Sequence, residues 1–181
     1  MNRERGDTLI EVLIATAILA AAVVGGLGIM NFGFGVILNA VERTQVQAAV
    51  TSQISLARFA RDEDVRDRAG LGGAGGTLWN DILARASTNY TSSVCDPATG
   101  APAPGDNPFY INEDGSAITT AGVPATPTAV PTAGNGLWVE AHRPSATTTY
   151  VDVYVKACWR PSAGSTSQEA KSVVRLYVPA S

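Results

Sequence analysis

The sequence is poor in the residues and motifs on which most enzyme active sites depend. Its 181 residues include one histidine, His142, and two cysteines. It has no nucleophile elbow, no glycine motif that cradles phosphate and no set of acids with metal-ligand spacing. The glycines at 72–76 follow an expected helix instead of opening one, which indicates a flexible link and not an anion site. These absences predict a protein that is not an enzyme and that uses no cofactor or metal ion.

An excess of basic residues is also missing. Lys and Arg total 13 while Asp and Glu total 16, which gives a formal net charge of −3. This balance gives no direct evidence for a nucleic-acid partner. The length allows one membrane helix and one compact soluble domain of roughly 110–120 residues, and no more.

Polar residues are scarcest near the amino terminus. Between Val12 and Met30 the only polar side chain is Thr16, and the apolar character extends to Leu38. This stretch is long enough to cross a bilayer of about 30 Å as a helix. Glu11 lies at its start, and an acid inside such a segment costs roughly 2.5–3.5 kcal/mol near the centre and less near an end. A carboxylate in that setting is stable only if it is paired or protonated, so Glu11 is a candidate functional residue.

The residues around Glu11 resemble a known signal. A short charged leader ending in Gly6, then Thr8-Leu9-Ile10-Glu11 and a long apolar helix, resemble the class III signal of type IV pilins and of the pseudopilins of type II secretion. The resemblance implies that a prepilin peptidase cuts the bond Gly6-Asp7 and that the new amino terminus, Asp7, is methylated. It also implies that Glu11 faces the amino-terminal charge of a neighbouring subunit during assembly, which sets the register. Asp7 departs from the family, which usually has Phe there.

The same resemblance predicts the partners and the location of the protein. The precursor would span the cell membrane once, in contact with lipid, and the mature chain would join other pilin subunits in a homo- or heteropolymer at the cell surface. The prepilin peptidase, an inner-membrane assembly platform and its ATPases would act on it. A major pilin, a minor pilin and a secretion pseudopilin all remain open, and the strand pattern near the carboxyl end resembles minor pilins.

Two other interpretations compete with the pilin signal. A secretory signal peptide could be cut after the alanines at 20–22, but the apolar run continues well beyond them. A single-pass anchor for a binding or adhesion domain fits the apolar length equally well. That domain would use the loop at 96–136 as its contact surface, but the anchor alone does not explain Glu11.

Glycines interrupt the middle of the apolar segment. Gly25, Gly26 and Gly28 each cost about 1 kcal/mol relative to alanine in a helix interior, and no proline occurs before Pro97. One hypothesis is that these glycines allow local unwinding when neighbouring subunits replace lipid. The other is that they permit close packing of helices in the membrane.

An amphipathic pattern follows from Asn39. One helical face carries Val46, Ala49, Val50, Ile54, Ala57 and Ala60, while Gln45, Gln47, Ser52, Gln53 and Arg58 fall elsewhere. The pattern ends in a charged run at 61–68 and then in glycines, which predicts one continuous helix from about Thr8 to about Arg68. The charged run is interpreted as a solvated helix end, with a contact to another subunit as the alternative.

The rest of the chain predicts a small α+β head. A short helix is expected over 77–86, and a loop rich in Pro, Gly, Ala and Thr over 96–136, with a possible hairpin near 109–115. Strands are expected over 137–141, 150–159 and 172–178. We expect an antiparallel sheet that packs the face of Val151, Val153 and Val155 on the amphipathic helix, a pilin-like roll.

For several polar residues of the head, the sequence favours a structural or solvent-exposed position over a binding site. His142 lies at a strand end, where we expect solvent. The polar side chains of Asp106, Asn112, Glu113 and Asp114 lack EF-hand order and favour turns over calcium.

Cys95 and Cys158 lack the spacing of a zinc or thioredoxin-like motif, and pairing is the expectation for an exported domain, worth about 4 kcal/mol on the chain-entropy model. Two free buried thiols are the alternative. The expected divisions are a leader at 1–6, a membrane and fibre-core helix at 7–38, an amphipathic helix at 39–69 and a head at 70–181.

Overall fold

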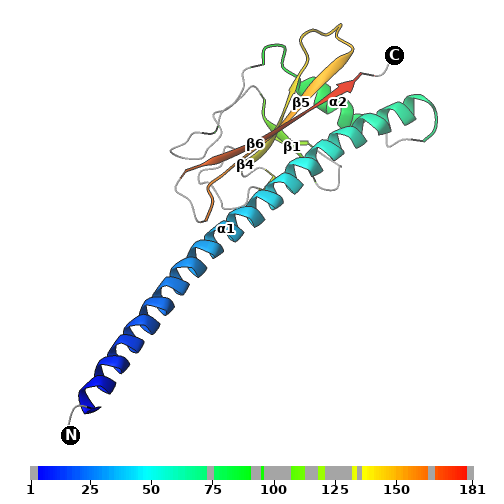
Figure 1. Cartoon of the computed structure of the whole chain (residues 1–181). Coiled ribbons are helices and arrows are strands. Elements are labelled where there is room, and N and C mark those ends of the chain that lie inside the picture. Colours follow the sequence, from blue (N-terminus) through cyan, green and yellow to red (C-terminus); the bar gives the residue numbers. More distant parts are fainter. Residues whose placement is uncertain are drawn as a thin grey trace. The chain divides into compact units, whose positions relative to one another are not determined.

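The computed structural model describes residues 4–72, 76–90, 95, 107–112, 118–120, 132–133, 136–162 and 166–178 (Figure 1). The chain divides between Ala40 and Val41 into two compact units. Helix α1 (Glu4–Arg68) contributes its first part to the amino-terminal unit and its second part to the carboxy-terminal unit. Its carboxyl end agrees with the end predicted from the charged run and the glycines.

From residue 9 to residue 38, α1 carries apolar side chains on every side. Leu9, Val24 and Phe32 are 64%, 70% and 76% exposed. A helix that is apolar all round needs a non-aqueous environment or neighbouring chains. By length and composition, α1 contains a segment able to cross a membrane. The helix is unbroken at Gly25, Gly26 and Gly28.

Six strands follow among the described residues. They are β1 (Phe109–Ile111), β2 (Ile118–Thr120), β3 (Thr132–Ala133), β4 (Gly136–His142), β5 (Tyr150–Trp159) and β6 (Gln168–Tyr177). The order is β2-β1-β4-β5-β6 with antiparallel neighbours, and β3 pairs with β4 in parallel outside that order. The expected hairpin exists as β1 and β2. β6 begins four residues before the predicted strand. The prediction missed its first half because small and charged residues alternate there without an apolar signal.

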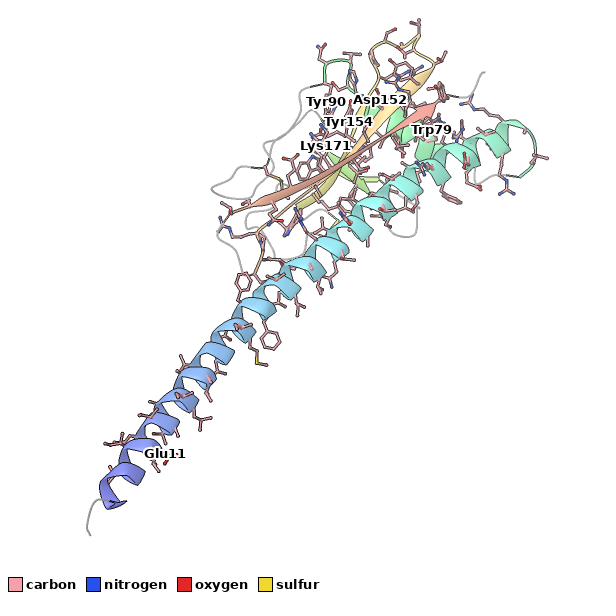
Figure 2. All side chains as sticks on the ribbon, viewed as in Figure 1. Glu11, Trp79, Tyr90, Asp152, Tyr154 and Lys171 are labelled. Atoms are coloured by element: carbon pink, nitrogen blue, oxygen red, sulfur yellow. A yellow bond between two sulfur atoms is a disulfide. The ribbon has the colours of Figure 1, made fainter. Side chains whose placement is uncertain are left out.

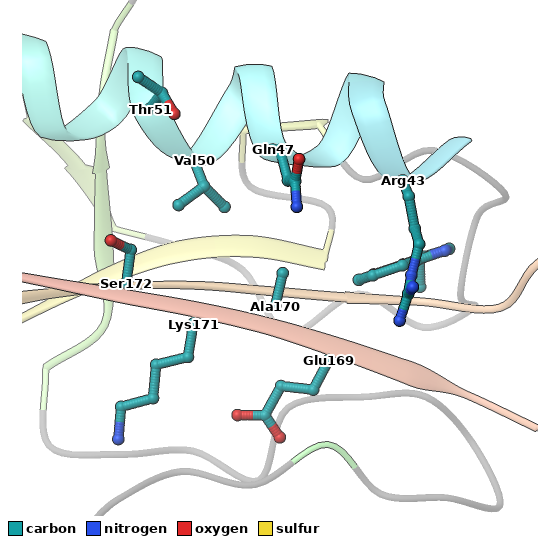
Figure 3. Close-up of a pocket in the computed structure, with 9 residues that line it drawn as sticks. Arg43, Gln47, Val50, Thr51, Glu169, Ala170, Lys171 and Ser172 are labelled. Atoms are coloured by element: carbon teal, nitrogen blue, oxygen red, sulfur yellow. The ribbon is translucent and has the colours of Figure 1, made fainter. Parts of the chain in front are cut away.

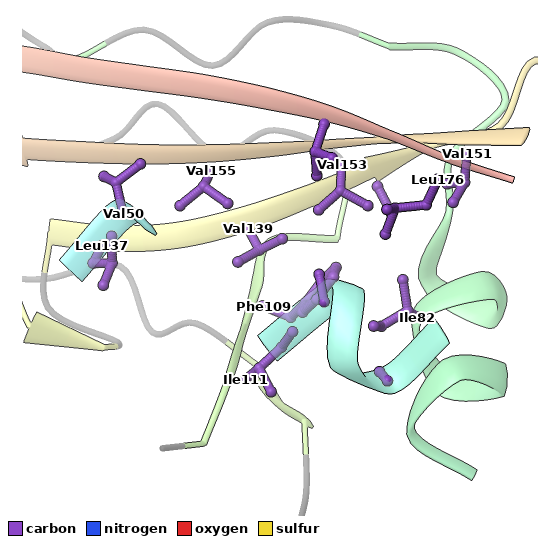
Figure 4. Close-up of a cluster of buried hydrophobic side chains, with 14 of the residues drawn as sticks. Val50, Ile82, Phe109, Ile111, Leu137, Val139, Val151, Val153, Val155 and Leu176 are labelled. Carbon is purple, nitrogen blue, oxygen red and sulfur yellow. The ribbon is translucent and has the colours of Figure 1, made fainter. Parts of the chain in front are cut away.

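The core lies between this sheet and the second part of α1, with α2 (Thr77–Arg85) at its side. Val151, Val153 and Val155 of β5 form one face, as predicted (Figure 4). They share the core with Val46, Val50, Ala57 and Ala60 of α1 and with Trp79 and Ile82 of α2. The expected α+β arrangement, a long helix packed on a small antiparallel sheet, is therefore confirmed.

The structure corrects two details of the sequence interpretation. Gln53, assigned to the polar side of α1, is buried. Asp64, assigned to a solvated helix end, is 3% exposed and accepts a hydrogen bond from Arg68 Nε at 2.9 Å. His142, expected in solvent at a strand end, is partly exposed, and its Nε2 lies 3.2 Å from the carbonyl oxygen of Thr88.

The glycine before α2 has a defined structural role. Gly76 has φ of 33° at the start of α2, a conformation that residues with a side chain rarely adopt. A Cβ at this position would also collide with the carboxylate of Asp64. The connection between α1 and α2 therefore requires glycine at position 76.

Candidate functional site

Glu11 is an acid on an apolar helix surface. It lies beside Ile10, Ile14, Ala15 and Ile18 on one face of the helix. Figure 2 shows Glu11 near the amino-terminal end of α1. Among the side chains that the structure describes, no basic group forms an ion pair with Glu11, which is exposed. Within the described part of the chain, the carboxylate of Glu11 therefore lies at the helix surface without a charge partner.

Gly6 and Asp7 lie in the first turns of α1, on the same helix as Glu11. The side chains of residues 1–8 are outside the described part, so the structure places the Gly6-Asp7 bond but not the Asp7 side chain. Gly25, Gly26 and Gly28 have nothing within 4 Å of a Cβ built on them. Contacts inside one molecule therefore do not require glycine at these positions. Both hypotheses about them involve contacts with other chains, either in the fibre or in the membrane.

Just after the apolar segment, Glu42 ties α1 to the β5–β6 connection. Glu42 is 6% exposed, and its two carboxylate oxygens accept the backbone N–H of Ser162 at 3.1 and 3.3 Å. A hydrogen bond to a charged acceptor contributes more than a neutral one, about 1.5–3 kcal/mol. Glu42 thus fixes the helix to the sheet at the amino-terminal edge of the carboxy-terminal unit.

Gln53 forms a second link between α1 and the sheet. Its side-chain amide donates to the carbonyl oxygen of Ile111 at 2.8 Å and accepts from the Ile111 N–H at 2.9 Å. The amide therefore satisfies both backbone groups of a residue in β1, as a neighbouring strand would. This explains why a polar side chain is buried on the apolar face of α1.

The face of the sheet that points away from α1 holds a buried ion pair. Lys156 Nζ lies 2.9 Å from Glu140 Oε2, and the two side chains are 0% and 2% exposed. Trp138 Nε1 donates to the other carboxylate oxygen, Glu140 Oε1, at 2.9 Å. Lys156 also lies 5.2 Å from the centre of the Tyr90 ring, so both charges are compensated inside the protein.

Tyrosines and cations cover the same face. Tyr90 and Tyr154 stack with ring centres 4.2 Å apart, and Lys171 Nζ lies 5.0 Å from the centre of the Tyr154 ring (Figure 2). Arg175 binds both carboxylate oxygens of Asp152, at 2.7 and 2.8 Å, and this hydrogen bonding raises the pKa of Arg175. Burial, followed by the charge of Asp152, raises the pKa of Tyr154 above its ordinary value of 10.0.

Cys95 and Cys158 form a disulfide bond with a Cα–Cα distance of 5.8 Å, in agreement with the expected pairing. The bond packs against Trp138. It joins the segment after α2 to β5 on the face that carries the buried ion pair. Asp106, Glu113 and Asp114 of the acidic cluster, and most of the loop at 96–136, lie outside the described residues. No group of three or more His, Cys, Asp or Glu that could hold a metal ion occurs within the described part of the chain.

Sequence reasoning missed Glu42, Gln53, Glu140 and Lys156. Glu140 and Lys156 alternate with apolar residues in their strands, which is also the pattern of a sheet whose second face is in water. A signal was present in Trp138, because an indole two residues from an acid on the same strand face needs a hydrogen-bond acceptor when it is buried. The partners of Glu42 and Gln53 are far away in the sequence, so no local pattern marks them.

The comparison with known families gives one match. The model described as the prokaryotic N-terminal methylation motif matches residues 1–27. These residues are therefore the class III prepilin signal of type IV pilins and pseudopilins, as the sequence interpretation predicted. Comparisons with curated proteins and with solved structures give no match. The match covers the candidate site around Gly6, Asp7 and Glu11 and leaves the head without a family assignment.

Proposed function

We propose that this chain is a structural subunit of a type IV pilus-like fibre. It is inserted as a prepilin, cut after Gly6 and polymerised through α1. The observation that carries the proposal is the methylation motif at residues 1–27. The apolar surface of residues 9–38 supports it, because fibre neighbours can cover the same side chains that lipid covers in the precursor.

Glu11 has a specific role in this proposal. Cleavage between Gly6 and Asp7 creates one α-ammonium group for each subunit, four residues before Glu11. A charge pair between Glu11 of one subunit and the amino terminus of the next compensates both charges in an apolar fibre core. Since each subunit supplies one acid and one amine, the pair also fixes the register between neighbours. N-methylation of Asp7 would preserve this positive charge.

The partners follow from the same steps. The prepilin peptidase processes the precursor in the membrane, the inner-membrane assembly platform and its ATPases extract it, and other pilin subunits receive it at the cell surface. The chain itself performs no catalysis in this scheme. A pseudopilin of type II secretion is the alternative within the same class, because it shares the motif that residues 1–27 match. A membrane-anchored adhesion domain is the alternative outside it.

The substitution Glu11→Val tests the proposal in cells that assemble the fibre. The variant should stay in the membrane fraction, while its amount in sheared fibres should fall by about tenfold or more, because an uncompensated amino terminus is left in the fibre core. Thr16→Val is the matched control, since it also replaces a polar residue of the span by valine but removes no charge. Equal amounts of the Glu11→Val and wild-type chains in fibres would remove Glu11 from any role in register.

A further inference from the structure

Strand β6 forms one edge of the sheet in the described part of the chain. β6 is the last strand in the order β2-β1-β4-β5-β6, and it pairs with β5 residue for residue from Gln168 to Tyr177 without a bulge. Within the described part of the chain, no strand pairs with its other edge. Alternate residues of such a strand direct their backbone N–H and C=O groups to the free side. Proline, a bulge or charged side chains protect the edges of sheets. β6 contains neither proline nor a bulge, and its exposed charges are Glu169, Lys171 and Arg175.

A groove of about 510 Å³ lies between this edge and α1. Figure 3 shows Arg43, Gln47 and Thr51 of α1 on one side and residues 169–172 of β6 on the other. The three α1 residues are spaced by four, so they form a row about 12 Å long. Four residues of extended chain span about 13 Å. The groove therefore matches a short segment added to the sheet as a strand.

The two faces of β6 differ at the groove. Ala170 and Ser172 are half-buried on the side of α1, and Ala170 packs against the core. Glu169 and Lys171 are exposed on the opposite face. Arg175, the other cation on that face, is already bound to Asp152. Lys171 Nζ lies 5.7 Å from the centre of the Tyr90 ring and 5.0 Å from that of Tyr154, and the residue stays exposed. The charges that an added strand would meet are those of Glu169 and Lys171, with Ala170 between them.

We propose that the occupant of this groove is β6 of a second copy of the chain, paired antiparallel about a two-fold axis at Ala170. In this register Glu169 of each copy lies directly opposite Lys171 of the other, which gives two equivalent pairs of opposite charge across the strands. On the side of α1 this register places Ala170 opposite Ala170 and Ser172 opposite Gln168 of the other copy. Ala170 and Ser172 are small enough to lie beside Gln47 and Thr51. No like charges oppose each other.

The geometry separates this contact from fibre assembly. Residues 43–51 of α1 run in the same direction as residues 169–172 of β6 (Figure 3), so the two-fold axis makes the α1 segments of the two copies antiparallel. The contact therefore joins heads of separate fibres, not neighbours whose helices lie parallel in one membrane. Its small size makes it a weak, reversible contact. It does not depend on Glu11 or on cleavage after Gly6.

A zero-length cross-linker tests the register with the intact chain. Equal amounts of unlabelled and ¹⁵N-labelled full-length protein are mixed in excess detergent, so that micelles hold single chains, and treated with a carbodiimide, which joins a carboxylate to an amine in direct contact. Peptide mass spectrometry should find Glu169 linked to Lys171 with one light and one heavy partner. Links found only between partners of the same label would overturn the dimer.

Charge exchange tests the same contact by affinity. With two tags on full-length chains, Glu169→Lys alone and Lys171→Glu alone should each lower co-purification by about tenfold, because each places like charges opposite each other twice. A mixture of the two variants should recover the wild-type level, since one copy then carries two lysines and the other two glutamates. Arg58→Glu and Asp67→Lys are matched controls on exposed positions of α1. Failure of the mixture to recover would overturn the proposed register.

Discussion

The buried pair of Glu140 and Lys156 makes the sharpest prediction about the head. The substitution Lys156→Met keeps a side chain of similar length but removes the charge that lies 2.9 Å from Glu140 Oε2. Glu140 is 2% exposed, so its carboxylate cannot turn to water. Breaking a buried pair by removing one partner costs about 3–5 kcal/mol. We expect this loss in the free energy of unfolding.

A second variant separates charge from packing. In Glu140→Gln/Lys156→Met no charge is left, and the amide oxygen introduced at position 140 still accepts the hydrogen bond from Trp138 Nε1. Replacing a buried ion pair by neutral groups of similar volume is often nearly neutral. The double variant should therefore recover most of the stability that Lys156→Met loses, to within about 1–2 kcal/mol of the wild type.

The assay is urea unfolding of a fragment comprising residues 39–181, monitored by tryptophan fluorescence, since Trp138 contacts the pair directly. The slope m should be unchanged so that the difference reports stability. A loss below about 1 kcal/mol for Lys156→Met would refute the reasoning, because it would mean that water or another cation already compensates Glu140. A double variant no more stable than the single one would show that the cost arises from packing.

Three further predictions concern the head. Cys158→Ser should lower the stability of residues 39–181 by about 2–5 kcal/mol, and non-reducing peptide mapping of the wild type should show Cys95 linked to Cys158, whereas free thiols would contradict the pairing. Residues 39–181 should unfold cooperatively and residues 70–181 should not, because the shorter fragment loses Val46 and Val50, worth about 1.5–3 kcal/mol each, and the Gln53 link; a cooperative thermal transition of the shorter fragment would refute this. The raised pKa of Tyr154 favours the neutral phenol in the folded state, so its contribution to stability is complete below about pH 10 and is lost as the pH rises through the folded pKa. Tyr154→Phe should therefore reduce the fall in the free energy of unfolding at alkaline pH, measured by urea unfolding at a series of pH values. An unchanged dependence of that free energy on pH would contradict the assignment.

The sequence predicted those parts of the fold that local patterns determine. Apolar periodicity located the face of α1 that carries Val46 and Val50, and alternation located the core face of β5. The residues whose burial was not predicted are polar ones with partners far away in the sequence. Gln53 is buried because a backbone group 58 residues away needs a donor and an acceptor, and no periodicity in a helix records such a need.

The residues of the candidate site fall into the same two groups, those that a local pattern predicts and those that meet only in the fold. Gly6, Asp7 and Glu11 were predicted from a continuous motif, and the family model matches the segment 1–27 that contains them. Glu140 and Lys156 come from different strands and meet only because β4 and β5 pair in the observed register. The β6 edge and its groove likewise require the strand order, which hydrophobic alternation does not determine.

The central claim is that the chain is processed as a prepilin, and the mass of its mature amino terminus tests it most directly. Protein purified from cells that contain the prepilin peptidase should begin at Asp7, with or without a methyl group, and Gly6→Val should retain the full-length precursor because the peptidase needs a small residue before the cut. A wild-type chain that begins at Met1 in the same cells would contradict the account and would favour a membrane anchor.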